Sequence, residues 1–192
     1  VACIRFAQGL DNSRVMEYDY ESPVKSVGHG LTTKADLENS AEVWALMLAL
    51  SQDIGHKLRK YDKRAGGVQI DIRNNQLKTK QWQCKLSPHT NSAAIIAKAA
   101  YTLFERSYSW DYPIRSVTVR AIDLYAASAP EQLDLFGNAA VVDKKERLES
   151  VVEEIHRRFG KNSILPATIS RSLPKLPTDR EIEIRMPTGM LS

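Results

Sequence analysis

The stretch from residue 22 to residue 124 alternates between the hydrophobic period of a strand and that of a helix, which is the strongest constraint on its fold. Val24 and Val27 open it as a strand, and the glycines Gly28 and Gly30 predict that this strand is short. Apolar residues then recur at helical spacing over residues 39–61. We therefore expect a short strand followed directly by a long helix.

Strand periodicity returns after this helix. Residues 68–72 alternate between apolar and polar side chains, and two asparagines at 74–75 supply a turn. On the return strand Lys80 has the same parity as Trp82, so we expect a bulge or twist near its start to re-aim the early residues. The pattern predicts a β-hairpin.

A second helix is predicted from about Thr90–Ser92, and a last strand at residues 113–124 presents Ser116, Thr118 and Arg120 on its polar face. The order strand, helix, strand, strand, helix, strand predicts an α+β sandwich of two layers. Its four-stranded sheet, antiparallel or mixed, carries both helices on one face. The other face is left polar and open.

Basic charge is concentrated in this same block. Residues 22–124 carry fifteen basic and nine acidic side chains, whereas residues 1–21 are net acidic and residues 125–192 are balanced. This excess favours a polyanionic partner, with a merely solubilising charge as the alternative. One basic run is not counted toward this partner, because cations at a helix C-terminus offset the helix dipole. It consists of Lys57, Arg59, Lys60, Lys63 and Arg64.

The chain after residue 124 is less regular. Residues 125–142 form a linker that contains QLDLF, whose apolar residues either fold back onto the core or are offered to another protein. A third helix is predicted over residues 143–160, where Asp143 and Glu146 have capping-box spacing and an apolar stripe follows. Residues 161–192 contain several prolines and predict an extended or disordered tail.

The sequence offers no catalytic constellation and no metal-ligand spacing. The histidines are scattered, the carboxylates lack partners at convincing spacing, and the two cysteines favour free thiols in a cytoplasmic protein. No apolar run is long enough to span a membrane. The apolar start VACIRFAQGL, without an initiator methionine, leads us to expect a fragment of a longer protein.

Several short motifs occur in a meaningful order. They are RFAQGLD, SPVKSVGHGLTT, PIRSVTVRAIDL, QLDLF and EEIHRRFGKNSIL. Together, over about residues 4–165, they resemble the C-terminal part of Y-family translesion DNA polymerases of the DinB/UmuC (ImpB/MucB/SamB) type. The resemblance implies that residues 1–21 end the thumb and that residues 22–124 are the little finger, which lies along primer–template DNA.

The resemblance also implies that catalysis belongs to the longer parent protein and not to this chain. In this family acidic residues of the palm domain hold two Mg²⁺ ions for nucleotidyl transfer during lesion bypass, a bacterial DNA-repair function of the SOS type. The palm motifs have no counterpart in this sequence. We therefore expect the parent to be a DNA-directed DNA polymerase, and this chain alone to be inactive and to need no cofactor.

QLDLF resembles the peptide by which bacterial replication and repair proteins bind the β sliding clamp. In such a peptide Leu135 and Phe136 would enter an apolar pocket, Gln132 would hydrogen-bond at its rim, and Leu133 would add apolar contact beside Asp134. Burial of the two anchors at about 1.5–3 kcal/mol each, less the cost of ordering the loop, predicts roughly micromolar affinity.

Backbone phosphates are bound by cations and by amide or hydroxyl donors, without reading of bases. Arg115 shares the parity of Val117, so an edge position is the alternative for it. The candidate DNA-binding residues are Lys25, Ser26, His29, Thr32, Thr33, Arg73, Lys78, Lys80, Arg115 and Arg120.

Two alternatives stay open. A non-enzymatic adaptor would bind a partner protein through QLDLF and the third helix. An RNA-binding α+β module would stack bases on aromatic residues of its open sheet face, and the sequence places no clear aromatic pair there.

Overall fold

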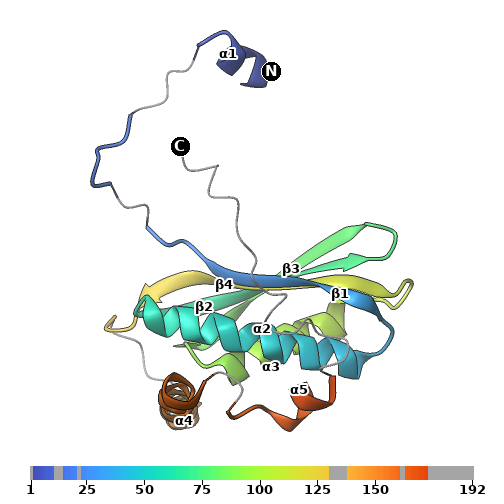
Figure 1. Cartoon of the computed structure of the whole chain (residues 1–192), viewed down its shortest axis with the longest axis vertical. Helices are drawn as coiled ribbons and strands as arrows, with labels where there is room; N and C mark the ends of the chain where they lie inside the picture. The colour runs from blue at the N-terminus through green and yellow to red at the C-terminus, as the bar shows by residue number, and fades with distance from the viewer. Residues whose placement is uncertain (1, 11–14, 21–22, 130–137, 161–162, 173–192) are drawn as a thin grey trace.

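The computed structural model describes residues 2–10, 15–20, 23–129, 138–160 and 163–172. Its elements follow one another in the predicted order from residue 27 to residue 126, with helices before and after (Figure 1). They are α1 (Ala2–Ala7), β1 (Val27–Leu37), α2 (Ser40–Lys60), β2 (Lys63–Asn74), β3 (Thr79–Thr90), α3 (Ala93–Ser107), β4 (Ile114–Ala126), α4 (Asn138–Phe159) and α5 (Ala167–Ser172).

The four strands form one antiparallel sheet in the order β1-β4-β2-β3. The helices α2 and α3 lie side by side beneath one face of this sheet, and α4 and α5 lie further below (Figure 1). The predicted two-layer α+β sandwich is therefore confirmed.

Strand alternation decides which side chains enter the core. On the central strand β2, Val68, Ile70 and Ile72 are fully buried against the helices, and the register places Ile70 opposite Val119 of β4 and Trp82 of β3. Because paired residues of an antiparallel sheet point to the same face, one row that faces the helices extends across three strands, with Trp82 only partly buried at its end. The intervening residues point to the opposite face.

The long helix α2 begins as the sequence predicts. The side chain of Asn39 accepts a hydrogen bond from the Glu42 amide at 3.0 Å, which satisfies one of the free amides of the first turn. Its apolar stripe, from Val43 to Leu58, is buried with less than 5% exposure at each core position. This stripe and Phe104 of α3 cover the sheet.

The prediction of a short first strand is wrong. β1 runs through both glycines to Leu37. A Cβ at Gly30 would lie 2.3 Å from the Thr118 Oγ1, and one at Gly28 would lie 3.2 Å from the Arg120 Cγ. The glycines therefore make room for larger side chains on the neighbouring strand, and they do not interrupt the sheet.

The helix and tail after residue 142 also differ from the prediction. α4 begins at Asn138, so Asp143 lies inside the helix and pairs with Arg147 at 2.8 Å, one turn on. Within the stretch predicted to be an extended tail, residues 167–172 form α5, and its Ile169 is only 6% exposed in the main core cluster. The remaining tail residues, 173–192, lie outside the described ranges.

We expect Ile96→Ala to destabilise the domain by about 2–5 kcal/mol, because Ile96 is fully buried and its truncation leaves a cavity. Chemical denaturation followed by circular dichroism measures this. Ile95→Ala is the matched control, since Ile95 is the preceding residue of α3 and is partly exposed. If the two variants lose the same free energy of unfolding, the assignment of Ile96 to the inner face of α3 is contradicted.

Candidate nucleic-acid interface

The face of the sheet opposite the helices carries three polar rows, each formed by one residue from every strand. The register of the strands defines them. In the order β1-β4-β2-β3 they are Gly28, Arg120, Gln69 and Gln83; Gly30, Thr118, Asp71 and Gln81; and Thr32, Ser116, Arg73 and Thr79. We call these twelve residues the open face; it contains cations, amides and hydroxyls and no aromatic residue.

The two arginines expected on this face lie there. Arg120 is in the first row and leans over Gly28, and Arg73 is in the third row and is exposed. Asp71, between these rows, accepts a hydrogen bond from the Gln69 Nε2 at 3.3 Å. The open face is therefore cationic at both ends and carries one carboxylate near its middle.

Two of the candidate residues on β1 point the other way. The His29 Nδ1 lies 2.8 Å from the Asp53 Oδ2 of α2, and Thr33 is buried with its hydroxyl donating to the Arg115 carbonyl at 3.1 Å. Both belong to the odd-numbered set of β1, which faces the helices. Lys25 and Ser26 are exposed just before β1, and Thr32 is exposed on the open face.

The remaining basic candidates are dispersed. Lys78 is exposed in the turn of the hairpin, and Lys80 pairs in register with the buried Ile72, so it belongs to the helix side of the sheet. The Nη1 of Arg115 lies 3.2 Å from the Lys34 carbonyl and 3.4 Å from the Asp36 Oδ1, which places it beside the end of β1. The expectation that Arg115 occupies an edge is consistent with this contact.

Lys85 is a residue that sequence reasoning missed. It pairs with Gly67 and is exposed, which extends the open face by a further cation. The signal was present, since Lys85 lies between Cys84 and Leu86 and so has the parity of Gln81 and Gln83.

Within the described ranges, no three His, Cys, Asp or Glu side chains gather closely enough to hold a metal ion. No described helix has the length and apolar character needed to cross a membrane. The proposed clamp peptide, Gln132–Phe136, lies outside the described residues.

Comparison with known families gives one match that covers most of the sheet and helices. The model of the impB/mucB/samB family C-terminal domain matches residues 24–135, more than half of the 192-residue chain. The chain belongs to this family. It is the C-terminal part of a Y-family DNA polymerase, as the motifs suggested. We call the sheet with α2 and α3, residues 27–126, the little finger, the name that the resemblance implied for residues 22–124.

Curated bacterial relatives agree. The chain is 36% identical over 159 residues to "DNA polymerase IV" of Acetivibrio thermocellus, which covers 83% of this chain and 40% of the relative. It is 30% identical over 162 residues to "DNA polymerase IV 2" of Halalkalibacterium halodurans, covering 82% and 38%. The chain therefore spans well under half of the length of these relatives.

Among solved structures, a Y-family DNA polymerase chimera matches with a TM-score of 0.46 and 12% sequence identity, over 65% of this chain and 35% of that one. At this TM-score the likeness adds nothing to the family assignment.

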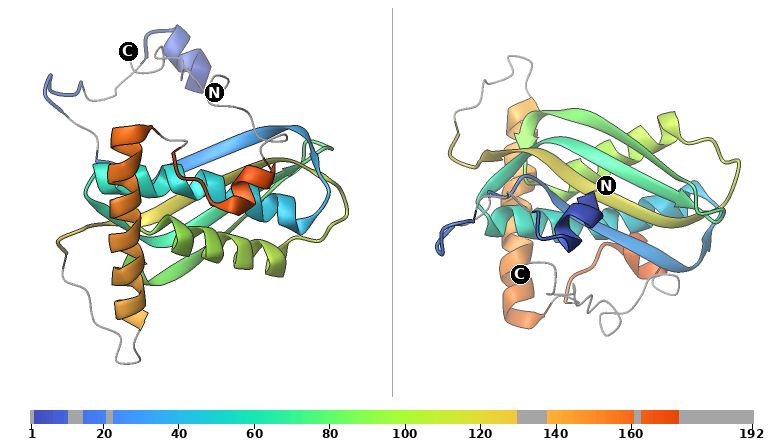
Figure 2. Two further views of the ribbon diagram at one scale, coloured as in Figure 1. Left: turned by 60° about the horizontal axis from the view of Figure 1, so that its bottom comes forward. Right: turned by 90° about the horizontal axis from the view of Figure 1, so that it is seen from above.

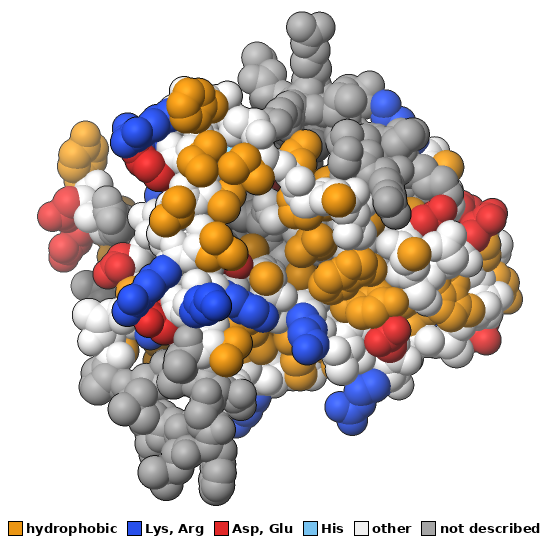
Figure 3. All heavy atoms as spheres, turned by 90° about the horizontal axis from the view of Figure 1, so that it is seen from below, with side chains coloured by type: hydrophobic (Ala, Val, Ile, Leu, Met, Phe, Trp, Pro, Cys, Tyr) orange, Lys and Arg blue, Asp and Glu red, His pale blue; other side chains and the backbone are white. Residues whose placement is uncertain are grey.

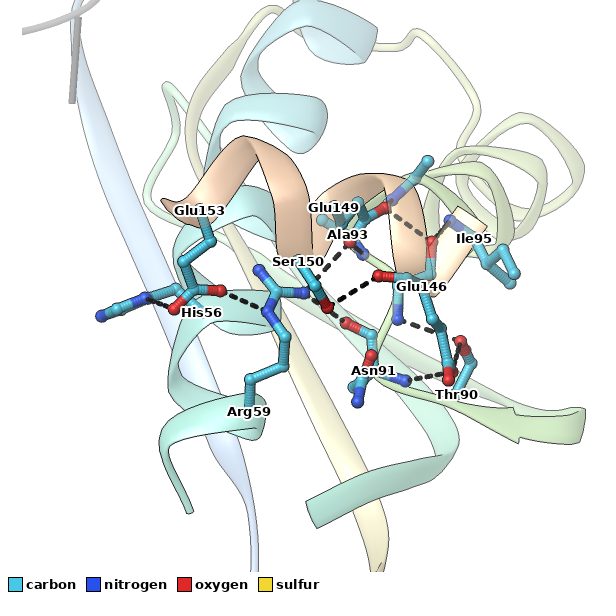
Figure 4. Close-up of polar contacts among 12 residues, drawn as sticks. His56, Arg59, Thr90, Asn91, Ala93, Ile95, Glu146, Glu149, Ser150 and Glu153 are labelled. Carbon is cyan, nitrogen blue, oxygen red and sulfur yellow. Dashed lines mark hydrogen bonds and ion pairs between the residues drawn. The ribbon is translucent and has the colours of Figure 1, made fainter. Parts of the chain in front are cut away.

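The helix α4 begins beyond the family match and crosses the ends of α2 and α3 beneath the little finger (Figure 2). Three glutamates on one side of α4, Glu146, Glu149 and Glu153, point toward the ends of α2 and α3 and of the adjoining strands β2 and β3 (Figure 4). Their spacing of three and four residues places them on one helix face. α4 is therefore docked through an acidic face.

The contacts of Glu149 explain this arrangement best. Its carboxylate accepts hydrogen bonds from the Ala93 amide at 2.7 Å and the Ala94 amide at 3.1 Å, and from the Ser92 hydroxyl at 2.6 Å. These amides belong to the first turn of α3 and have no partner within their own helix. A carboxylate also interacts favourably with the positive end of the helix dipole.

The other two glutamates bind on either side of Glu149. Glu146 is buried, accepts from the Thr90 hydroxyl at 2.8 Å and pairs with Arg64 at 3.0 Å. Glu153 binds the His56 Nδ1 at 2.6 Å and the Arg59 Nε, while the Arg59 Nη1 lies 3.2 Å from Glu149. Two residues of the basic run at 57–64 therefore hold α4.

These contacts change the acidity of Glu153. Partial burial raises its pKa, but the hydrogen bonds and charges of Arg59 and His56 outweigh burial and hold the pKa below its ordinary value. A group whose pKa is lowered on folding stabilises the fold above its unfolded pKa, and this stabilisation is lost as the pH falls through the folded pKa.

We expect Glu153→Gln to lower the melting temperature at neutral pH, and this difference from wild type to shrink as the pH falls between about 5 and 3. Thermal unfolding in a series of buffers measures it. Glu38→Gln is the control, since Glu38 is exposed and lies far from α4 in the sequence. A difference that stays constant over the whole pH range would contradict the ion pairs of Glu153.

Proposed function

We propose that this little finger holds the backbone of duplex DNA against its open face, as part of a bacterial lesion-bypass polymerase. The observation that carries the proposal is the composition of that face. Arg73, Arg120 and Lys85 supply positive charge, and the hydroxyls and amides between them supply hydrogen-bond donors. Membership of a DNA polymerase family supports DNA as the polyanion.

The chemistry of the face favours duplex backbone over bases. Cations and short polar side chains bind phosphates without reading sequence, so binding should depend steeply on salt and little on sequence. An RNA-binding module of this general shape stacks bases on aromatic residues of the sheet. The open face has no aromatic residue, which disfavours that alternative.

The activity of the whole protein follows as a proposal from the same family. We propose that the parent is a DNA-directed DNA polymerase of the bacterial cytoplasm that acts in DNA repair, with Mg²⁺ held in its palm domain. The curated relatives carry the name DNA polymerase IV. This chain would contribute DNA binding and recruitment, and no nucleotidyl transfer of its own.

Recruitment is assigned to the peptide Gln132–Phe136. It lies in the sequence between the end of β4 at Ala126 and the start of α4 at Asn138. We propose that it binds the β sliding clamp through Leu135 and Phe136, with micromolar affinity that suits rapid exchange. An adaptor without DNA binding is the competing hypothesis.

For DNA binding, we expect Arg73→Ala/Arg120→Ala to weaken the affinity of the chain for a primer–template duplex. The slope of log affinity against log salt should become shallower by about 0.9 for each phosphate that is no longer neutralised, nearly two in all. Fluorescence anisotropy titrations at several salt concentrations measure both quantities.

Two single lysine variants serve as controls. Lys80→Ala removes a cation from the helix side of the sheet, and Lys98→Ala removes an exposed cation from α3. Neither should change the salt slope. If either lysine variant loses as much DNA affinity as the arginine pair, DNA binding reflects net charge alone. If the wild-type chain binds no DNA, the adaptor hypothesis is favoured.

For clamp binding, we expect micromolar association of the chain with a purified bacterial β clamp, and its loss in Leu135→Ala/Phe136→Ala. Surface plasmon resonance measures it, with Asn138→Ser as a control just outside the peptide. The double variant should keep its DNA affinity. Equal clamp binding by the wild type and the double variant would overturn the assignment of this peptide.

A further inference from the structure

The side of α4 that faces away from the little finger is apolar. Val141, Leu148, Val151 and Phe159 are 54%, 63%, 59% and 74% exposed, and Ile155 is partly exposed between them. Their spacing of seven, three, four and four residues places all five along one side of the helix. We call these five residues the α4 stripe.

The exposure of this stripe is unusual because α4 is already docked. Surface helices normally bury their apolar stripe and leave charged residues in water. α4 does the reverse, since its glutamates are bound to the little finger and its apolar side chains face solvent (Figure 3, left part of the view). Contiguous exposed apolar residues of this kind mark an interaction surface.

The charges around the stripe are basic. Lys144 and Arg158 lie seven residues before and after Val151, so they are in line with it at the two ends of the stripe. Both are exposed. The three docked glutamates are turned away, and the other two acids of α4 pair with arginines of the same helix. Asp143 pairs with Arg147 at 2.8 Å, and Glu154 pairs with both Arg157 and the Nε of Arg158, each at 2.7 Å.

We infer that the α4 stripe is the docking surface for an acidic amphipathic helix of another protein. Anchors spaced by three, four and seven residues are those of helix-to-helix recognition. Carboxylates beside the partner's apolar side chains would pair with Lys144 and with Arg158, whose guanidinium has further N–H groups besides the Nε that Glu154 binds. A second copy of this chain fits poorly, because its own Lys144 and Arg158 would meet like charges.

Other occupants fit the stripe less well. Duplex DNA would satisfy the basic residues but would leave Leu148, Val151 and Phe159 without apolar contact. A membrane-surface helix has a broad apolar face rich in large residues, whereas this stripe is one residue wide over much of its length. The helix α4 itself lies below α2 and α3, on the side of the sheet opposite the open face, so a partner helix on α4 and DNA on the open face would occupy different sides (Figure 1).

The test uses the full chain and a synthetic helical peptide with leucines at heptad positions a and d and glutamates at e and g. A second peptide carries lysines in place of the glutamates. We expect micromolar binding of the acidic peptide by isothermal titration calorimetry, and affinity lower by about tenfold or more for the basic one. Leu148→Ala/Phe159→Ala should weaken binding of the acidic peptide by about tenfold or more.

The charge preference is tested separately with Lys144→Glu/Arg158→Glu, which should now prefer the basic peptide. The residues changed in the two double variants, Leu148, Phe159, Lys144 and Arg158, are all exposed, so circular dichroism should show unchanged folding. Thr102→Ala, at an exposed residue of α3, is the neutral control. The inference is overturned by equal binding of both peptides or by binding of neither. It is also overturned if Leu148→Ala/Phe159→Ala still binds the acidic peptide but loses self-association, DNA affinity or binding to phosphatidylserine vesicles.

Discussion

The burial of one face of the sheet beneath α2 and α3 decides where the other functional groups of this little finger lie. Val68, Ile70 and Ile72 must face the helices, so the residues between them must face the opposite side. A slip of one residue would exchange the two sets and bury Arg73. The DNA-binding surface that we propose is therefore a direct consequence of the hydrophobic core.

This dependence also explains which parts of the site the sequence could predict. Arg73 and Arg120 were assigned correctly to the open face because alternation is a local property. Lys80 was misplaced because a bulge was expected near the start of β3. The irregular pairing lies at the other end of the strand, where Ala65 and Gly67 of β2 face Thr90 and Lys85. Pairing irregularities depend on the neighbouring strand, which a single segment does not reveal.

The docking of α4 was beyond prediction for a related reason. Its apolar stripe and its row of glutamates were both visible in the sequence, and local rules favour burial of the stripe. The partners of the glutamates come from residues 56–94, distant along the chain, and include the free amides at the start of α3. Three carboxylates that find such partners are bound to this domain, while most of the apolar stripe stays exposed.

The buried position of Ile169 bears on where this domain ends. The family match stops at residue 135, yet a side chain more than thirty residues later completes the core beneath α2. The unit that folds is thus larger than the stretch that the family model matches. A boundary drawn from that match alone would remove part of the hydrophobic interior.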